Sequence, residues 1–175
     1  LLTIKPNCKL AMKFSKKDKL KELIWFISKN YNQELYETKL WKLVFFVDAD
    51  FYQKYGQKIT DVGYIKNLHG PTPSYTVAKK AIDELVREKF IIKGEDNQYN
   101  AVKDMELRYL DNKKQDAIRA TCEKYYKLST GQICLLTHKD PIYLATEKKN
   151  DLLDFSFVNY RDDDEFELED PNFER

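Results

Sequence analysis

The stretch KLWKLVFFVDADFYQKYG, residues 39–56, indicates where the core of this protein lies. Its apolar side chains recur at helical spacing and form one stripe, made up of Leu40, Leu43, Val44, Val47, Phe51 and Tyr55. Trp41, Phe45 and Tyr52 form a second apolar face. A helix that is apolar on nearly all sides is usually central to its domain, so we expect core rather than a ligand platform. Gly56 predicts the C-terminal end, because glycine adopts the left-handed conformation without penalty.

Charged residues within this stretch exclude a membrane-spanning helix, which needs about 20 mostly apolar residues. They are Lys39, Lys42, Asp48, Asp50 and Lys54. Asp48 lies inside the apolar run and is the acid that we expect to be most buried. A buried carboxylate must find hydrogen-bond donors, and structural acids are more common than catalytic ones. We therefore predict a structural role for Asp48.

The composition predicts one helix-rich globular domain. The 175 residues suffice for a modest core, and an aromatic content of 14% excludes a chain that is disordered throughout. Five glycines and five prolines are too few for an all-β sandwich with many tight turns. Seven lysines among residues 1–21 predict a basic N-terminal arm over residues 1–14, and eight acids predict a flexible acidic tail over residues 161–175. Residues 15–160 form the expected domain.

Neither the cysteines nor the histidines form a recognisable chemical site. Cys8, Cys122 and Cys134 form no CxxC pair, and no signal peptide precedes them, which predicts a reduced, cytoplasmic protein. His69 and His138 have no partners at metal-ligand spacing, and Cys134 with His138 would supply only two ligands. No phosphate-binding glycine loop or nucleophile-elbow motif is present. We predict no catalysis, no cofactor and no metal.

Local signals predict a mainly α domain (α+β), compact, with five to seven helices and a small antiparallel sheet. Ser15 and Asp18 form a capping pattern for the first helix, and Thr130 is the expected cap of a short helix that Pro141 ends. Expected helices cover residues 15–30, 34–56, 74–89, 111–127 and 130–140. Two apolar segments flank KGEDNQ as a β-hairpin, and the expected single sheet combines residues 59–66, 90–93 and 98–103.

A helix followed by a hairpin is also the order of a winged-helix unit. Its recognition helix would be residues 75–89, with the basic residues Lys79, Lys80, Arg87 and Lys89. Three acids share that surface: Asp83, Glu84 and Glu88. This mixture of charges gives little net positive potential to attract phosphate. A winged-helix-like DNA-binding regulator is therefore the alternative rather than the first interpretation.

Two ordered motif blocks carry a family resemblance. The first reads KLWKLVFFVDADFYQKYGQKIT and then YIKNLHGPTP, with the pattern residues Lys39, Leu40, Phe46, Asp48, Tyr55, Gly56, Ile59, Thr60, Tyr64, Gly70, Pro71 and Pro73. The second reads STGQICLLTHKDPIYLAT, with Thr130, Leu135, His138, Tyr143 and Thr146. Together they resemble the Panacea domain of SocA-like antitoxins over about residues 17–155. His69, Thr72 and Tyr143 depart from the residues that are common in that pattern.

The resemblance implies an antitoxin that binds and neutralises a protein toxin encoded nearby, without catalysis. Some relatives act as adaptors for proteolysis, which makes a protease or chaperone a further partner, and others are known only as phage-associated proteins, so another phage or prophage role is a second alternative. Membrane insertion is not implied, and nucleic acid is not the expected partner. The resemblance also marks a set of motif residues as structural: Lys39, Leu40, Asp48, Tyr55, Gly56, Thr60, Thr130 and His138.

We expect the toxin to bind near the Gly70–Pro73 loop, because a proline-stiffened loop loses little entropy on docking. Aromatic side chains are common anchors of protein interfaces. The candidate toxin-binding residues are Tyr64, His69, Gly70, Pro71, Pro73, Tyr75 and Tyr143.

Overall fold

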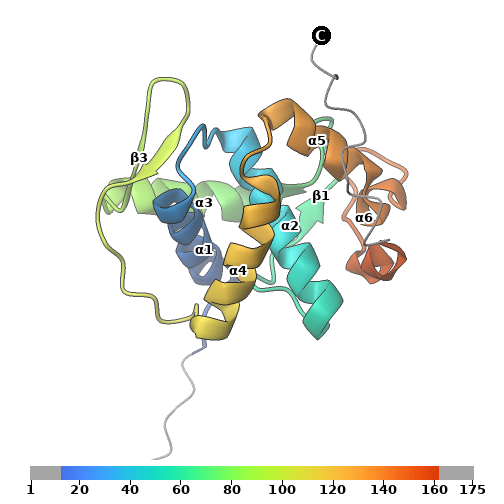
Figure 1. Ribbon diagram of the computed structural model, residues 1–175, viewed down its shortest axis with the longest axis horizontal. Helices are drawn as coiled ribbons and strands as arrows, with labels where there is room; N and C mark the ends of the chain where they lie inside the picture. The colour runs from blue at the N-terminus through green and yellow to red at the C-terminus, as the bar shows by residue number, and fades with distance from the viewer. Residues whose placement is uncertain (1–12, 162–175) are drawn as a thin grey trace, which may run out of the picture.

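The computed structural model describes residues 13–161 and arranges them around one central helix (Figure 1). The elements are α1 (Lys16–Asn30), α2 (Glu37–Tyr55), β1 (Tyr64–Ile65), β2 (Thr72–Pro73), α3 (Tyr75–Arg87), β3 (Ile91–Lys93), β4 (Tyr99–Ala101), α4 (Asn112–Tyr125), α5 (Thr130–Lys139), α6 (Pro141–Leu144) and the 3-10 helix η1 (Phe155–Tyr160). Six α-helices in the described part, with short antiparallel strands, confirm the predicted mainly α fold class.

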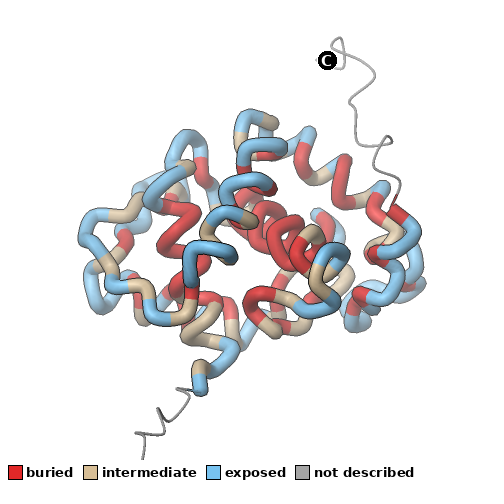
Figure 2. Tube along the Cα trace, turned by 60° about the horizontal axis from the view of Figure 1, so that its bottom comes forward, coloured by how far each residue is buried: buried red, intermediate tan, exposed pale blue. Residues whose placement is uncertain are grey.

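Helix α2 is the centre of the core. Leu40, Leu43, Val44 and Phe45 on this helix are 0% exposed. Figure 1 shows α4 crossing in front of α2, with α3 behind α1 and with α5 and α6 on the far side from the hairpin. Figure 2 shows that the buried stretches gather in these interior helices. The prediction that the aromatic stretch is core is therefore confirmed.

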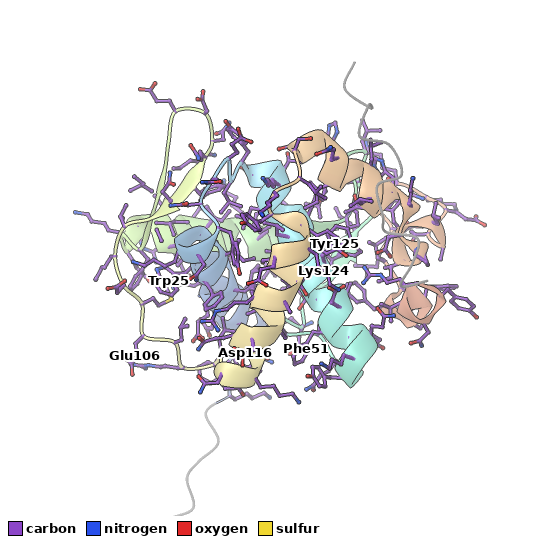
Figure 3. The ribbon with its side chains drawn as sticks, in the orientation of Figure 1. Trp25, Phe51, Glu106, Asp116, Lys124 and Tyr125 are labelled. Carbon is purple, nitrogen blue, oxygen red and sulfur yellow. The ribbon has the colours of Figure 1, made fainter. Side chains whose placement is uncertain are left out.

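The ends of α2 and its contact with α4 follow from particular side chains. Gly56 caps the helix in the left-handed conformation, with a φ of 70°, and donates its N–H to the Tyr52 carbonyl. Helix α4 carries Tyr125, which is labelled in Figure 3. The rings of Tyr125 and of Phe46 on α2 stack with their centroids 4.2 Å apart. Aromatic burial of this kind dominates core energetics and holds α4 against α2.

The caps of the other helices confirm one prediction and correct another. Ser15 and Asp18 form the expected capping box at the start of α1. At α5 the cap is Ser129, whose side chain accepts from the Gln132 N–H, and Thr130 is already the first helical residue. Pro141 begins α6, because the first position of a helix needs no donated N–H.

The described strands form two separate two-stranded sheets, so the prediction of a single sheet was wrong. The hairpin of β3 and β4 is antiparallel, with Ile91 opposite Ala101, as expected. Strand β1 pairs instead with β2, where Tyr64 lies opposite Pro73. Proline is tolerated in this position because β2 is an edge strand. A strand of two residues carries no periodicity, so the pattern of the sequence could not reveal this pairing.

Arg161 anchors the C-terminal end of the described chain. Its side chain, only 4% exposed, donates to Asp140 from Nε at 2.8 Å and reaches Asp50 from Nη1 at 2.9 Å. Asp140 precedes α6 and Asp50 lies on α2, so one guanidinium connects three parts of the fold. Arg161 therefore belongs to the domain and not to the acidic tail in which the composition placed it. Residues 162–175 of that tail, and residues 1–12 of the basic arm, lie outside the described residues.

Candidate functional site

Asp48 fixes the segment that leads from α2 to β1. Its side chain is completely buried. Oδ1 accepts from the Thr60 amide at 2.9 Å, and Oδ2 accepts from the Thr60 hydroxyl and from the Tyr64 hydroxyl, the latter at 2.7 Å. Burial raises the pKa of the Asp48 carboxyl, while the bonds from Thr60 and Tyr64 oppose that rise. The expected burial and pairing of Asp48 are confirmed.

Tyr64 is a core residue, so the expectation that it is an exposed anchor was wrong. It is 1% exposed, and its ring packs against Phe45 and Phe155 with centroids 5.6 and 5.4 Å away. The reason is the acceptor on α2: the buried Asp48 takes the Tyr64 hydroxyl and turns this face of β1 inward. In a strand of two residues the sequence does not indicate which side chain faces the core. Here the hydrogen bond to Asp48 decides that Tyr64 does.

The Gly70–Pro71 turn is clamped between α2 and α5. Gly70 has a φ of 96°, and a Cβ there would lie 2.3 Å from the Thr137 hydroxyl oxygen. Lys42 is buried and donates from Nζ to the Pro71 carbonyl at 2.8 Å. Burial lowers the pKa of the Lys42 ammonium to about 8. Lys42 was not among the predicted site residues, although a lysine within an apolar helical stripe was a signal for it.

The second motif block closes on the same loop. The His138 Nε2 is 3.1 Å from the Leu68 carbonyl, and the Tyr143 hydroxyl donates to the Asn67 carbonyl at 2.8 Å. The rings of His138 and Tyr143 are 4.9 Å apart, and burial lowers the pKa of the histidine. Two blocks that are distant in the sequence thus hold the connection between β1 and β2 from both sides.

The remaining motif residues lie along α2 and at helix ends. Lys39 and Leu40 are buried in the first turns of α2, and Tyr55 is half-buried next to Gly56 at its end. Thr130 is half-buried in the first turn of α5. The candidate binding residues Gly70, Pro71 and Pro73 are buried as well. They can shape a binding surface only by directing the backbone of the loop.

A groove of about 660 Å³ opens beside this loop, between the start of α2, helix α3 and the hairpin. Among the predicted binding residues it is lined by His69, Pro73 and Tyr75. Tyr143 is half-buried and stays outside the lining, on the other side of the loop. Aromatic and charged residues outside the predicted toxin-binding set complete the walls: Tyr36, Glu37, Trp41, Lys42, Lys79, Asp83, Lys93, Asp96 and Tyr99.

Glu37 is the best-supported polar group of the groove. Oε1 accepts from the Trp41 indole N–H at 3.4 Å, and Oε2 accepts from the Tyr99 hydroxyl at 3.1 Å. Lys93 lies 3.6 Å from Oε2. Burial, followed by the charge of Glu37, raises the pKa of the Tyr99 hydroxyl. Helical periodicity placed Trp41 on an apolar face, but its indole N–H donates to Glu37 one turn earlier, and Glu37 also accepts from Tyr99 of the hairpin, 62 residues further along the chain.

The groups that line the groove are mainly aromatic and charged. Within residues 13–161, no three His, Cys, Asp or Glu side chains are placed to hold a metal ion. No helix in that range is long and apolar enough to cross a membrane. What the described site does offer is aromatic rings and side-chain charges of both signs along one concave surface.

Comparison with known proteins identifies the family. Residues 40–142 match the family model described as antitoxin SocA-like, Panacea domain. The match runs from α2 into α6 and includes the clamped loop, and it covers more than half of the 175 residues. Comparisons with curated proteins and with solved structures gave no match. The resemblance found in the two motif blocks is thereby confirmed, and the chain belongs to the family of SocA-like antitoxins with a Panacea domain.

Proposed function

We propose that this protein neutralises a protein toxin, encoded in a neighbouring gene, by binding it directly and stoichiometrically without chemical turnover. The observation that carries the proposal is the antitoxin family match over residues 40–142. The aromatic groove beside the Gly70–Pro73 loop is the docking site in this proposal, with His69 and Tyr75 at its rim.

The side chains of the groove support binding to a protein. Tyrosine and tryptophan are the most frequent anchors of protein interfaces. Trp41 and Tyr99 are almost fully buried in the groove wall, while Tyr36 and Tyr75 expose 36% and 71% of their surface. Trp41 and Tyr99 therefore support the wall of the groove from behind, and Tyr36 and Tyr75 are the rings that are open to a partner.

The clamped loop supports the same conclusion. His138, Tyr143 and Lys42 each bond a carbonyl of the connection between β1 and β2. The backbone that carries His69 is therefore ordered before a partner arrives, which lowers the entropic cost of docking.

A DNA-binding regulator is the alternative, because α3 followed by β3 and β4 has the order of a winged helix. Lys79 and Lys80 are exposed on α3, but so is Asp83. The recognition helix would offer phosphate little net positive charge, which favours the protein partner.

The test is co-expression with the product of the neighbouring open reading frame. We expect the chain to restore growth and to co-purify with that product at a fixed ratio. Tyr75→Ala should weaken both effects, whereas Tyr160→Ala is a matched control, since Tyr160 is 73% exposed but lies on η1, outside the groove.

Three results would argue against or refine the proposal. Rescue by strongly substoichiometric antitoxin with no complex would indicate an enzyme or a repressor. Specific binding to operator DNA at about 0.15 M salt, without toxin binding, would favour the regulator. A toxin level that falls only in protease-proficient cells would show delivery for proteolysis in place of direct inhibition.

A further inference from the structure

The groove already holds a cation of the protein itself. The ammonium group of Lys93 lies 3.6 Å from the Glu37 carboxylate and 5.7 Å from the centre of the Tyr99 ring. Carboxylates and aromatic rings both attract cations in proteins, the first by charge and the second by the quadrupole of the ring. Lys93 therefore shows which kind of group this part of the groove accepts.

The Lys93–Glu37 pair is easily replaced. The two side chains are 41% and 46% exposed, and ion pairs that are open to solvent contribute little. Glu37 does not depend on Lys93 for its orientation, because Trp41 and Tyr99 each donate a hydrogen bond to it. A cation from outside would find the carboxylate already positioned.

Charges elsewhere in the groove agree with a cationic guest. Asp83 and Asp96 also line it and are exposed. Lys79 is the exposed cation on the same wall, while the Lys42 ammonium is buried against the Pro71 carbonyl and is turned to the backbone. Three carboxylates thus face the groove, and two of its three lysines, Lys42 and Lys93, already contact groups of the chain.

We infer that Glu37, held in place by Trp41 and Tyr99, is the seat for an arginine side chain of the bound toxin, which displaces Lys93. Arginine fits better than lysine, because its planar guanidinium can bond the carboxylate with two donors. The inference deepens the proposed function and rests on it, since it names the group that the groove recognises.

The test uses two small probes on the full chain. Nα-acetyl-arginine amide carries the guanidinium, and Nα-acetyl-citrulline amide is a neutral analogue of the same shape. The chain has two tryptophans, so NMR of the indole N–H groups reads the site directly. Trp41 reports on the groove, and Trp25, whose N–H bonds the Lys103 carbonyl, is an internal control (Figure 3 places Trp25 on α1).

We expect the arginine probe to shift the Trp41 signal in a saturable manner and to leave Trp25 unchanged. Citrulline should bind at least about fivefold more weakly. Glu37→Gln keeps an oxygen for the two aromatic donors and should weaken arginine binding by about fivefold. Lys93→Ala removes the internal competitor and should tighten it by about two- to fivefold. Glu123→Gln on α4, outside the groove, should change nothing.

Equal binding of arginine and citrulline would overturn the inference. So would the opposite pair of signs, tighter binding by Glu37→Gln and weaker binding by Lys93→Ala, because the Glu37 carboxylate would then not be the group that attracts the guanidinium. If the toxin still co-purifies with Glu37→Gln at wild-type affinity, the arginine seat is wrong and the antitoxin function stands. If the wild-type chain forms no toxin complex at all, the proposed function fails, whatever the probes show.

Discussion

At the scale of single residues, buried polar side chains determine the course of the backbone. Asp48 holds Thr60 and Tyr64, and Lys42 holds Pro71. Each of these side chains extends from α2 to the segment that follows it. A buried polar group without a partner is costly, so these bonds select one path for the chain over competing compact ones.

Asp48→Asn should retain the fold and toxin neutralisation. Asparagine still offers an oxygen to the Thr60 amide, and the hydroxyls of Thr60 and Tyr64 can turn to accept from its amide group. We expect a loss of about 1–3 kcal/mol for asparagine and a larger loss for Asp48→Leu, which removes the acceptor of the Thr60 amide and hydroxyl and leaves the Tyr64 hydroxyl only the Val44 carbonyl, at 3.2 Å. Urea unfolding measures both. If Asp48→Asn abolished neutralisation in a fully folded protein, Asp48 would have a direct role in recognition.

Gly70→Ala should destabilise the protein by about 2–4 kcal/mol. The new Cβ would lie 2.3 Å from the Thr137 hydroxyl oxygen, and the φ of 96° is strained for alanine. Adding Thr137→Ala should recover only part of the loss, because it removes the clash but not the strain. Gly131→Ala is the control, since its Cβ would meet Ser129 only at an ordinary 3.9 Å. Equal thermal melting of both single variants would show that the loop is not clamped.

At the scale of elements, helix ends follow from local chemistry, whereas strand pairing does not. Gly56 and the Ser15–Asp18 box act within one helical turn, so their positions can be read from the sequence. Strand β1 pairs with β2, a strand of two residues that follows the Gly70 turn. The bonds of Asp48 and this turn bring the two strands side by side. Elements of two residues are products of tertiary contacts.

Ser129→Ala should cost about 0.5–2 kcal/mol, because it removes the side chain that accepts from the Gln132 N–H at the start of α5. Thr130→Ala should cost less, since Thr130 is the first helical residue and not the cap. The free energies of unfolding of the two variants compare the positions directly. A larger loss for Thr130→Ala would indicate that Thr130 is the cap, as the sequence pattern predicted.

At the scale of the whole molecule, long-range contacts join the two motif blocks and the C-terminal end to α2. His138 and Tyr143 reach the loop after β1, and Arg161 reaches both Asp50 and Asp140. The groove is a product of this assembly, because its walls come from α2, α3, the loop and the hairpin.

Arg161→Met should destabilise the protein by about 3–5 kcal/mol, because it leaves the completely buried Asp140 without its counter-charge. Arg119→Met is the matched control: its bond to Asp116 joins side chains that are 44% and 78% exposed. Pairs this open to solvent contribute at most about 1 kcal/mol. Chemical denaturation compares the two, and similar small losses would show that Arg161 is not an anchor of the domain.

Features that depend on near neighbours along the chain could be predicted from the sequence. Helical periodicity identified α2 as core, Gly56 marked its end, and the hairpin of β3 and β4 followed from two apolar segments around a turn. The motif blocks, which combine such local patterns in a fixed order, also predicted the antitoxin family that the comparison then confirmed.

Which side of each element meets which partner depends on tertiary contacts. The inward turn of Tyr64 depends on Asp48, sixteen positions earlier in the chain, and the seat around Glu37 depends on Tyr99 from the hairpin. These hydrogen bonds form between groups that adjacent sequence does not relate. Periodicity reports the faces of one helix or strand, whereas the groove arises where the faces of several elements converge.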